Sequence, residues 1–154
     1  MPPKKKLSAT TLISPMDAAS SLDAATEQLL AAQDAETRQT AARAIAAACR
    51  NTDDNNDIVA RDALRPLAEM LQGSHGEAEA GALALCELAR NSENKVSIAA
   101  AGAIPLLVVL LQSGTEVAKG NATAALWNLS TNVDNRVSIA VAGAIPLLVA
   151  LLQN

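Results

Sequence analysis

Few side chains in this sequence are placed where they could do chemistry. His75 is the single histidine, and it falls in the stretch 73–76, which we interpret as a solvated loop. One loop histidine cannot build a catalytic triad, and the sequence holds no nucleophile elbow, phosphate-binding loop or zincin motif. We therefore expect a protein that is not an enzyme and that uses no cofactor.

The two cysteines, Cys49 and Cys86, are too few and too widely spaced for a disulfide framework or a zinc site. Both lie within an Ala/Leu-rich helical pattern, where a free cysteine behaves as a small buried hydrophobe. We expect both to be reduced core residues, and we expect no bound metal.

A polar stretch in the first third of the chain resembles the start of a calcium-binding loop. Asp53, Asn55 and Asp57 have the spacing of its first ligands. Ile58, however, stands where that loop needs a glycine, and Leu64 stands where it needs a bidentate glutamate. We interpret this stretch as a turn between helices.

Charge and hydropathy limit the partners. The formal net charge is −4, so no broad basic field exists to attract nucleic acid. Lys4–Lys6 is the one cationic run, which we interpret as a solvated tail, with a weak nuclear-import signal as the alternative. No apolar stretch reaches the roughly 18 residues of a membrane helix, and Met1-Pro2-Pro3 opens no signal peptide. We expect a cytoplasmic or nuclear protein that contacts neither nucleic acid nor membrane.

The composition indicates the elements that position these residues. Half of the residues are apolar, yet the sequence has no Phe, no Tyr and one Trp. Core volume must come from Leu, Ile, Val and above all Ala, which favours helices and lacks the bulk that suits strands. The composition predicts an all-α fold.

An internal repeat predicts how the helices are arranged. Residues 94–112 recur at 135–153 with three differences, and Pro105 and Pro146 are 41 residues apart. Near-identity at this period is typical of a solenoid of stacked helical units, in which no unit buries its apolar face alone. Each unit reads as a short helix, a medium helix opened by a Gly-Ala-Ile-Pro turn, and a longer third helix.

The repeat divides the chain into five segments. We predict a disordered lead at 1–13, degenerate leading or capping helices at 14–53, repeats at 54–93 and 94–134, and a partial repeat at 135–154. The partial repeat holds the first and second helices of a unit and lacks the third.

Two motifs carry a resemblance to a known family. Residues 102–111 (GAIPLLVVLL), followed by 124–130 (AALWNLS), resemble armadillo repeats, closest in flavour to those of plant U-box and importin-α-like proteins. The resemblance implies a right-handed α-solenoid with three helices per repeat. It also implies that the third helices line a concave groove that binds extended peptides or partner proteins.

The third helix of the repeat at 94–134 has two distinct faces when its residues are projected at about 100° each. Ala122, Ala125, Leu126 and Leu129 share the face that we expect to be buried. The resemblance makes the opposite face the groove wall, with an Asn at the place of Asn128 that hydrogen-bonds the backbone of a ligand. The groove residues implied in this way are Thr40, Arg43, Ala80, Leu83, Glu87, Asn121, Ala124 and Asn128.

Importin-α-like proteins pair that Asn with a Trp at the place of Ala124 and repeat the pair along the groove. Here Glu87 and Leu83 stand at the matching positions one repeat earlier, so the ladder is broken and nuclear-import cargo binding is the less favoured reading. Trp127 lies one step outside the groove face, where we expect it to fill space between repeats.

The end of the sequence supports an alternative function. Because the last unit lacks its third helix, four leucines would lose their usual cover: Leu147, Leu148, Leu151 and Leu152. An uncovered apolar patch marks an association site. The leading hypothesis is a scaffold or adaptor that binds a protein or peptide in its groove. The alternative is a structural module, or a fragment of a longer array, that associates through this end, including with a second copy of itself.

Overall fold

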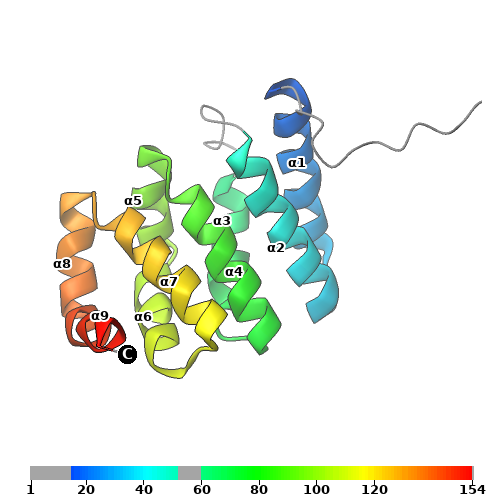
Figure 1. Cartoon of the computed structure of the whole chain (residues 1–154). Coiled ribbons are helices and arrows are strands. Elements are labelled where there is room, and N and C mark those ends of the chain that lie inside the picture. The colour runs from blue at the N-terminus through cyan, green and yellow to red at the C-terminus, as the bar shows by residue number, and fades with distance from the viewer. Residues whose placement is uncertain (1–14, 52–59, 154) are drawn as a thin grey trace, which may run out of the picture.

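The computed structural model describes residues 15–51 and 60–153, and every regular element within these ranges is a helix (Figure 1). The expected all-α class is confirmed. The lead at 1–13 and the calcium-loop-like residues Asp53, Asn55 and Asp57 lie outside the described residues. The helices are α1 (Pro15–Ala31), α2 (Ala35–Arg50), α3 (Ala60–Met70), α4 (His75–Leu88), α5 (Ser92–Ala100), α6 (Ala103–Ser113), α7 (Glu116–Leu129), α8 (Val133–Val141) and α9 (Ala144–Leu152).

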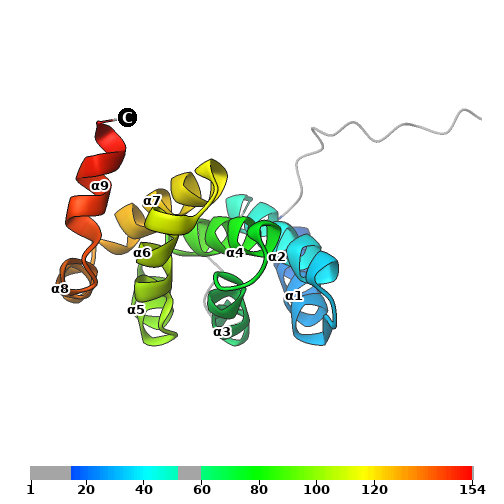
Figure 2. The same cartoon turned by 90° about the horizontal axis from the view of Figure 1, so that it is seen from below.

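The helices form two layers of a solenoid. The long helices α2, α4 and α7 lie side by side in one layer, with α4 packed against both of the others. Helices α1, α3 and α5 lie in the other layer, and α9 rises past α7 at the end of the array (Figure 2). Each unit therefore buries its apolar side against its neighbours in the stack.

Two glycines form the corners inside the units. Gly102, between α5 and α6, has a φ of 80°, and Gly143, between α8 and α9, has a φ of 82°. This left-handed conformation strains any residue with a Cβ, so glycine is required here. The helix pairs bend by 82° and 83° at these corners. Within the described ranges no single helix is long and apolar enough to span a membrane, and these bent pairs meet the criteria of length and composition only when their two helices are counted together.

Polar N-cap residues set the starts of α2, α4, α5, α7 and α8. The Ser74 hydroxyl accepts the backbone N–H of Glu77, and the Glu77 carboxylate accepts the backbone N–H of Ser74 at 2.9 Å, which is a complete capping box. Asp34 and Thr115 cap α2 and α7 in the same way through one side-chain oxygen. The expected loop at 73–76 is thus shorter than predicted, because His75 is already the first residue of α4.

The core is made of leucine, isoleucine and many alanines, and the predicted buried face of α7 is confirmed. Ala122, Ala125, Leu126 and Leu129 are at most 1% exposed. Cys49 is buried as expected. Cys86 is half-buried, so it is less buried than the expected core position. Both thiols are free.

Two buried asparagines join successive units. Asn94 is 1% exposed and donates from its side chain to the backbone oxygen of Leu88 at 3.1 Å. Its counterpart Asn135 donates to the backbone oxygens of Leu129 and Lys95, at 3.3 and 3.1 Å. The bonds to Leu88 and Leu129 give a side-chain donor to carbonyls at the ends of α4 and α7, beyond each helix's own backbone ladder. The bond to Lys95 joins α8 to α5.

Candidate functional site

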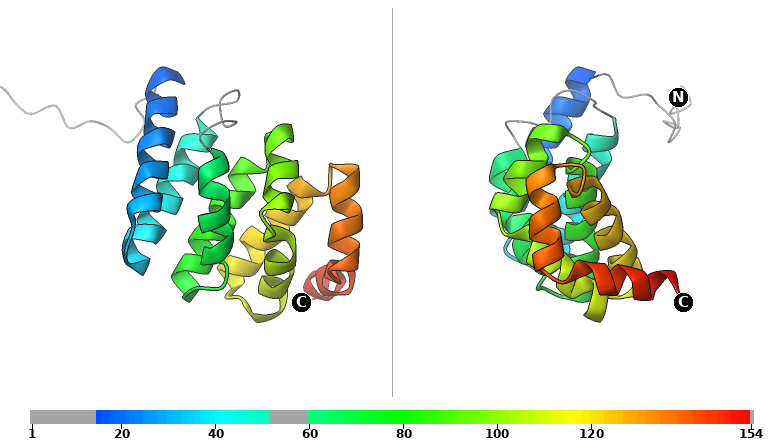
Figure 3. Two further views of the ribbon diagram at one scale, coloured as in Figure 1. Left: turned by 180° about the vertical axis from the view of Figure 1, so that it is seen from behind. Right: turned by 90° about the vertical axis from the view of Figure 1, so that its left-hand side faces the viewer.

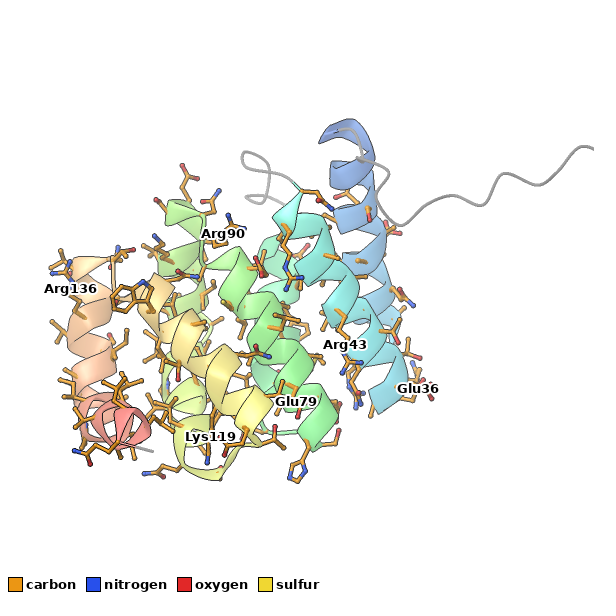
Figure 4. All side chains as sticks on the ribbon, in the orientation of Figure 1. Glu36, Arg43, Glu79, Arg90, Lys119 and Arg136 are labelled. Carbon is orange, nitrogen blue, oxygen red and sulfur yellow. The ribbon has the colours of Figure 1, made fainter. Side chains whose placement is uncertain are left out.

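The solvent-facing side of α2, α4 and α7 is the surface on which the predicted groove residues fall (Figures 2 and 4). We call it the third-helix face and define it by Thr40, Arg43, Ala47, Leu83 and Ala124. Thr40, Arg43, Ala47 and Ala124 are exposed, and Leu83 is half-buried against the core. Ala80 is 1% exposed, so the expectation that it lines the surface is wrong.

Arg43 is a charged residue on this face that is free to meet a ligand. Its side chain lies on the exposed side of α2 (Figure 4), and among the described residues it makes no hydrogen bond or ion pair. A guanidinium in this state offers its full set of donors to a carboxylate or a backbone carbonyl.

Glu87 is engaged within the protein. Its carboxylate lies 2.8 Å from the guanidinium of Arg50 on α2 and 3.4 Å from that of Arg90, and its side chain is 13% exposed. The group therefore bridges α2 and the end of α4. These three groups together carry one net positive charge.

Asn121 and Asn128 turn their side-chain nitrogens toward the neighbouring third helix. Asn121 donates to the backbone oxygen of Glu79 and Asn128 to that of Cys86, both at 3.1 Å and both 42 residues back. Each asparagine is half-buried. The pair therefore fastens α7 onto α4, a role that a helical projection of the sequence does not reveal.

Trp127 is the largest difference from expectation at this surface. Its side chain is 75% exposed, so it does not fill space between the described repeats. A hollow of about 560 Å³ opens beside it, between α7 and α9. The residues that line this α7–α9 hollow are Glu116, Lys119, Gly120, Thr123, Ala124, Trp127 and Leu151. Of the predicted groove residues, Ala124 is the one that lines it.

The predicted association patch, which we call the C-terminal patch, lies on α9. Leu147, Leu148 and Leu151 are half-buried, and Leu152 is 87% exposed. Other apolar side chains extend the uncovered surface around α8 and α9: Val137, Val141, Ile145 and Val149. Figure 3 shows α8 and α9 together at the end of the array.

Ionisable groups near these surfaces have structural partners. The Glu77 carboxylate accepts the backbone N–H of Ser74 and pairs with Arg38 of α2 at 2.7 Å, and together these lower the pKa of Glu77 against the opposing effect of burial. Burial raises the pKa of Cys49 to about 12 and also raises the pKa of Cys86. Within the described ranges, no three His, Cys, Asp or Glu side chains gather in a way that could hold a metal ion.

The fold and the stacked units define an α-solenoid repeat protein. Residues 91–131, which span α5, α6 and α7, match the armadillo/beta-catenin-like repeat. The crystal structure of an engineered protein is similar over 86% of this chain and 56% of its own length, with a TM-score of 0.71 and 29% sequence identity. The chain thus spans little more than half of that structure. No curated protein sequence is significantly similar to the chain. Residues 91–131 are therefore similar to one armadillo repeat, within a chain whose described part folds as an all-helical repeat solenoid.

Proposed function

We propose that this protein is a non-catalytic adaptor that holds an extended segment of a partner protein across its third-helix face. Armadillo repeats generally mediate protein–protein interactions, which supports the general role. The observation that carries the finer proposal is Arg43, an exposed guanidinium without a partner among the described residues, beside the small exposed side chain of Ala47.

The chemistry of the face favours one class of segment. Arg43, with the two arginines around Glu87, attracts a carboxylate, and the small side chains of Ala47 and Ala124 leave room for a backbone to approach closely. Leu83 and Trp127 offer apolar contact farther along. We therefore propose an extended peptide with an acidic residue followed by apolar residues. We place this interaction in the cytoplasm or nucleus, and imaging of the tagged protein in cells tests that location.

A selection from short random peptides tests the proposal. Peptides enriched on the wild-type protein should lose most of their affinity for Arg43→Glu, because the attraction becomes repulsion. Arg65→Glu is the matched control, since Arg65 is exposed on α3 in the other layer and its pair with Glu69 is a surface pair of little energetic value. Peptides that bind both variants equally well would place the binding surface elsewhere.

A second candidate function rests on the C-terminal patch. We propose association through this end of the array, with a second copy or another protein, because Leu152 is 87% exposed where its counterpart Leu111 is 4% exposed. Light scattering across a range of concentrations tests for self-association, which Leu152→Asp should abolish. A wild-type protein that stays monomeric at high concentration would rule out the second copy as the partner.

A further inference from the structure

The α7–α9 hollow and the C-terminal patch together resemble the surface of α4 and α6 that α7 covers. Helices α6 and α9 begin with the same six residues, Ala-Ile-Pro-Leu-Leu-Val, and α7 packs against α6. Leu107, Leu110 and Leu111 of α6 are 0%, 5% and 4% exposed. Their counterparts on α9 are less buried, since Leu148 and Leu151 are half-buried and Leu152 is 87% exposed. The residues are alike, but α6 packs mainly against α7, and no described helix takes that place beside α9.

The second wall of the hollow repeats the surface that α4 presents to α7. On α4, the backbone oxygens of Glu79 and Cys86 accept hydrogen bonds from Asn121 and Asn128. One period of 41 residues later, these two acceptor positions are Gly120 and Trp127 of α7, and both line the hollow. The side of α7 that faces the hollow is thus the equivalent of the side of α4 that α7 covers.

We infer that the hollow and the C-terminal patch form one docking site for a single amphipathic α-helix of a partner, seated as α7 is seated on α4 and α6. The site continues the interfaces that already exist between those helices. This inference rests on the proposed association through the C-terminal patch and names what that patch takes.

The existing contacts specify the chemistry of the docked helix. Its inner face carries small residues at the places of Ala118, Ala122 and Ala125, because α7 approaches closely there with side chains at most 1% exposed. Leucines at the places of Leu126 and Leu129 meet the leucines of the C-terminal patch. Two asparagines seven residues apart donate to the backbone oxygens of Gly120 and Trp127, at the positions that Asn121 and Asn128 address one repeat earlier. At Trp127 the amide takes the place of the Ser130 hydroxyl, which donates to that oxygen at 2.7 Å.

Trp127 is the reporter for the test, since it is the single tryptophan of the chain and lines the hollow. The probe is a synthetic peptide with the sequence of residues 115–131 and the change Trp127→Leu, so that only the protein fluoresces. Titration should shift the emission of Trp127 to shorter wavelength and saturate. Adding Asn121→Ala and Asn128→Ala to the peptide should weaken binding about tenfold or more, since two hydrogen bonds are lost.

Changes in the protein locate the binding. Leu152→Asp should abolish the shift without unfolding the chain, because that side chain is largely exposed. Val96→Asp, on α5 and 57% exposed, is the matched control and should bind the peptide as the wild type does. Arg43→Glu should also bind normally, so that a failure of the third-helix-face proposal stays separate from a failure of this one.

A tethered version decides the question if the free peptide binds too weakly to detect. The sequence of residues 114–131, with Trp127→Leu, is appended after Asn154. The emission of Trp127 should shift to shorter wavelength at every concentration, and the midpoint of thermal unfolding should rise. Unchanged emission in the tethered chain overturns the inference, even where Leu152→Asp shows that the patch mediates association. Shielding of Trp127 that grows with the concentration of the protein alone, and that the peptide does not displace, overturns it in favour of a second copy.

Discussion

The side-chain nitrogen of Asn128 lies 3.1 Å from the backbone oxygen of Cys86, which is 42 residues earlier in the chain. The two atoms belong to α7 and α4, so this bond connects neighbouring repeats. Asn121 makes the same bond to Glu79, two helical turns away on the same pair of helices. Two parallel bonds fix both the spacing and the rotation of α7 on α4. The face that the two helices expose therefore depends on them.

Removing the Asn128 bond should destabilise the protein. We expect Asn128→Ala to lower the free energy of unfolding by about 1–2 kcal/mol, because the backbone oxygen of Cys86 loses a partner in a half-buried place. Asn128→Asp should cost more, since a carboxylate would face a carbonyl oxygen. Urea denaturation measures both. Asn51→Ala is the control, because exposed Asn51 bonds within its own helix, and a cost there equal to that of Asn128→Ala would contradict the inter-repeat role.

The repeat allows the same substitution in two environments. Leu111 is 4% exposed and Leu152 is 87% exposed, although they occupy equivalent positions. Leu111→Ala should lower the free energy of unfolding by about 2–5 kcal/mol, as expected for a leucine in a packed core. Leu152→Ala should change it by no more than about 0.5 kcal/mol. Equal losses, measured by chemical denaturation of the two variants, would mean that Leu152 is covered in solution.

Two glycines should respond to alanine in opposite directions. Gly102 has a φ of 80°, so Gly102→Ala should destabilise by about 1–2 kcal/mol through backbone strain. Gly120 lies inside α7, and apart from its chain neighbours and the backbone of its own helix no atom lies within 4 Å of where its Cβ would be. Gly120→Ala should therefore stabilise by roughly 0.5–1 kcal/mol. Thermal unfolding followed by circular dichroism gives both signs, and a stabilising Gly102→Ala would show that the corner does not need its left-handed residue.

The Glu77 carboxylate should make stability depend on pH. Its side chain is 8% exposed, and the Ser74 backbone N–H and Arg38 lower its pKa in the folded protein. A lowered folded-state pKa means that its stabilisation is complete above the usual glutamate value of about 4.3 and is lost as the pH falls below it. Unfolding titrations of wild type and Glu77→Gln should differ by about 1–3 kcal/mol at neutral pH and converge in acid.

Glu69→Gln is the matched control for that titration. Glu69 also pairs with an arginine, but its side chain is 65% exposed and the pair lies within one helix. We expect no measurable difference in the free energy of unfolding from wild type. If the difference in unfolding free energy between wild type and Glu77→Gln stays constant into acid, then Glu77 stabilises the protein through packing and not through its charge.

The two thiols should differ in reactivity. Burial raises the pKa of Cys49 to about 12, so almost no thiolate forms at neutral pH, and the side chain is inaccessible as well. Cys86 is half-buried and should react slowly with a disulfide reagent in the folded protein. Cys49 should react only on unfolding. Mass spectrometry of labelled peptides distinguishes them, with Cys86→Ala as the control that leaves only the buried thiol. Rapid labelling of Cys49 in the native state would contradict the packing of α2.

The fold was readable from the sequence because the signals were local. The 41-residue recurrence, the N-cap residues and the face of Ala122, Ala125, Leu126 and Leu129 each depend on spacing within one unit. The capping box that starts α4 at His75 was missed, although Ser74 and Glu77 carry its standard spacing. The glycines on both sides of this stretch, Gly73 and Gly76, favour a loop in the sequence.

The candidate site was harder to predict because it depends on how one unit is rotated against the next. A helical projection correctly separates Asn128 from the core, but it cannot tell whether the amide turns to solvent or to Cys86. Trp127 shows the same limit, since its exposure depends on what lies beyond α7. The buried bonds of Asn94 and Asn135 cross between elements, so no pattern within a single helix indicates them.

Because α9 lies at one end of the stack of helices, we expect unfolding to begin there. Helix α9 rests mainly on α6 and α8, whereas α4 is held between α2 and α7. In a linear array with nearest-neighbour coupling, the element with fewest neighbours opens first. Fraying should therefore begin at α9 and travel inward toward α4. A protease or an unfoldase would therefore engage the protein first at α9. A partner that docks on α9 would also slow the degradation of the protein.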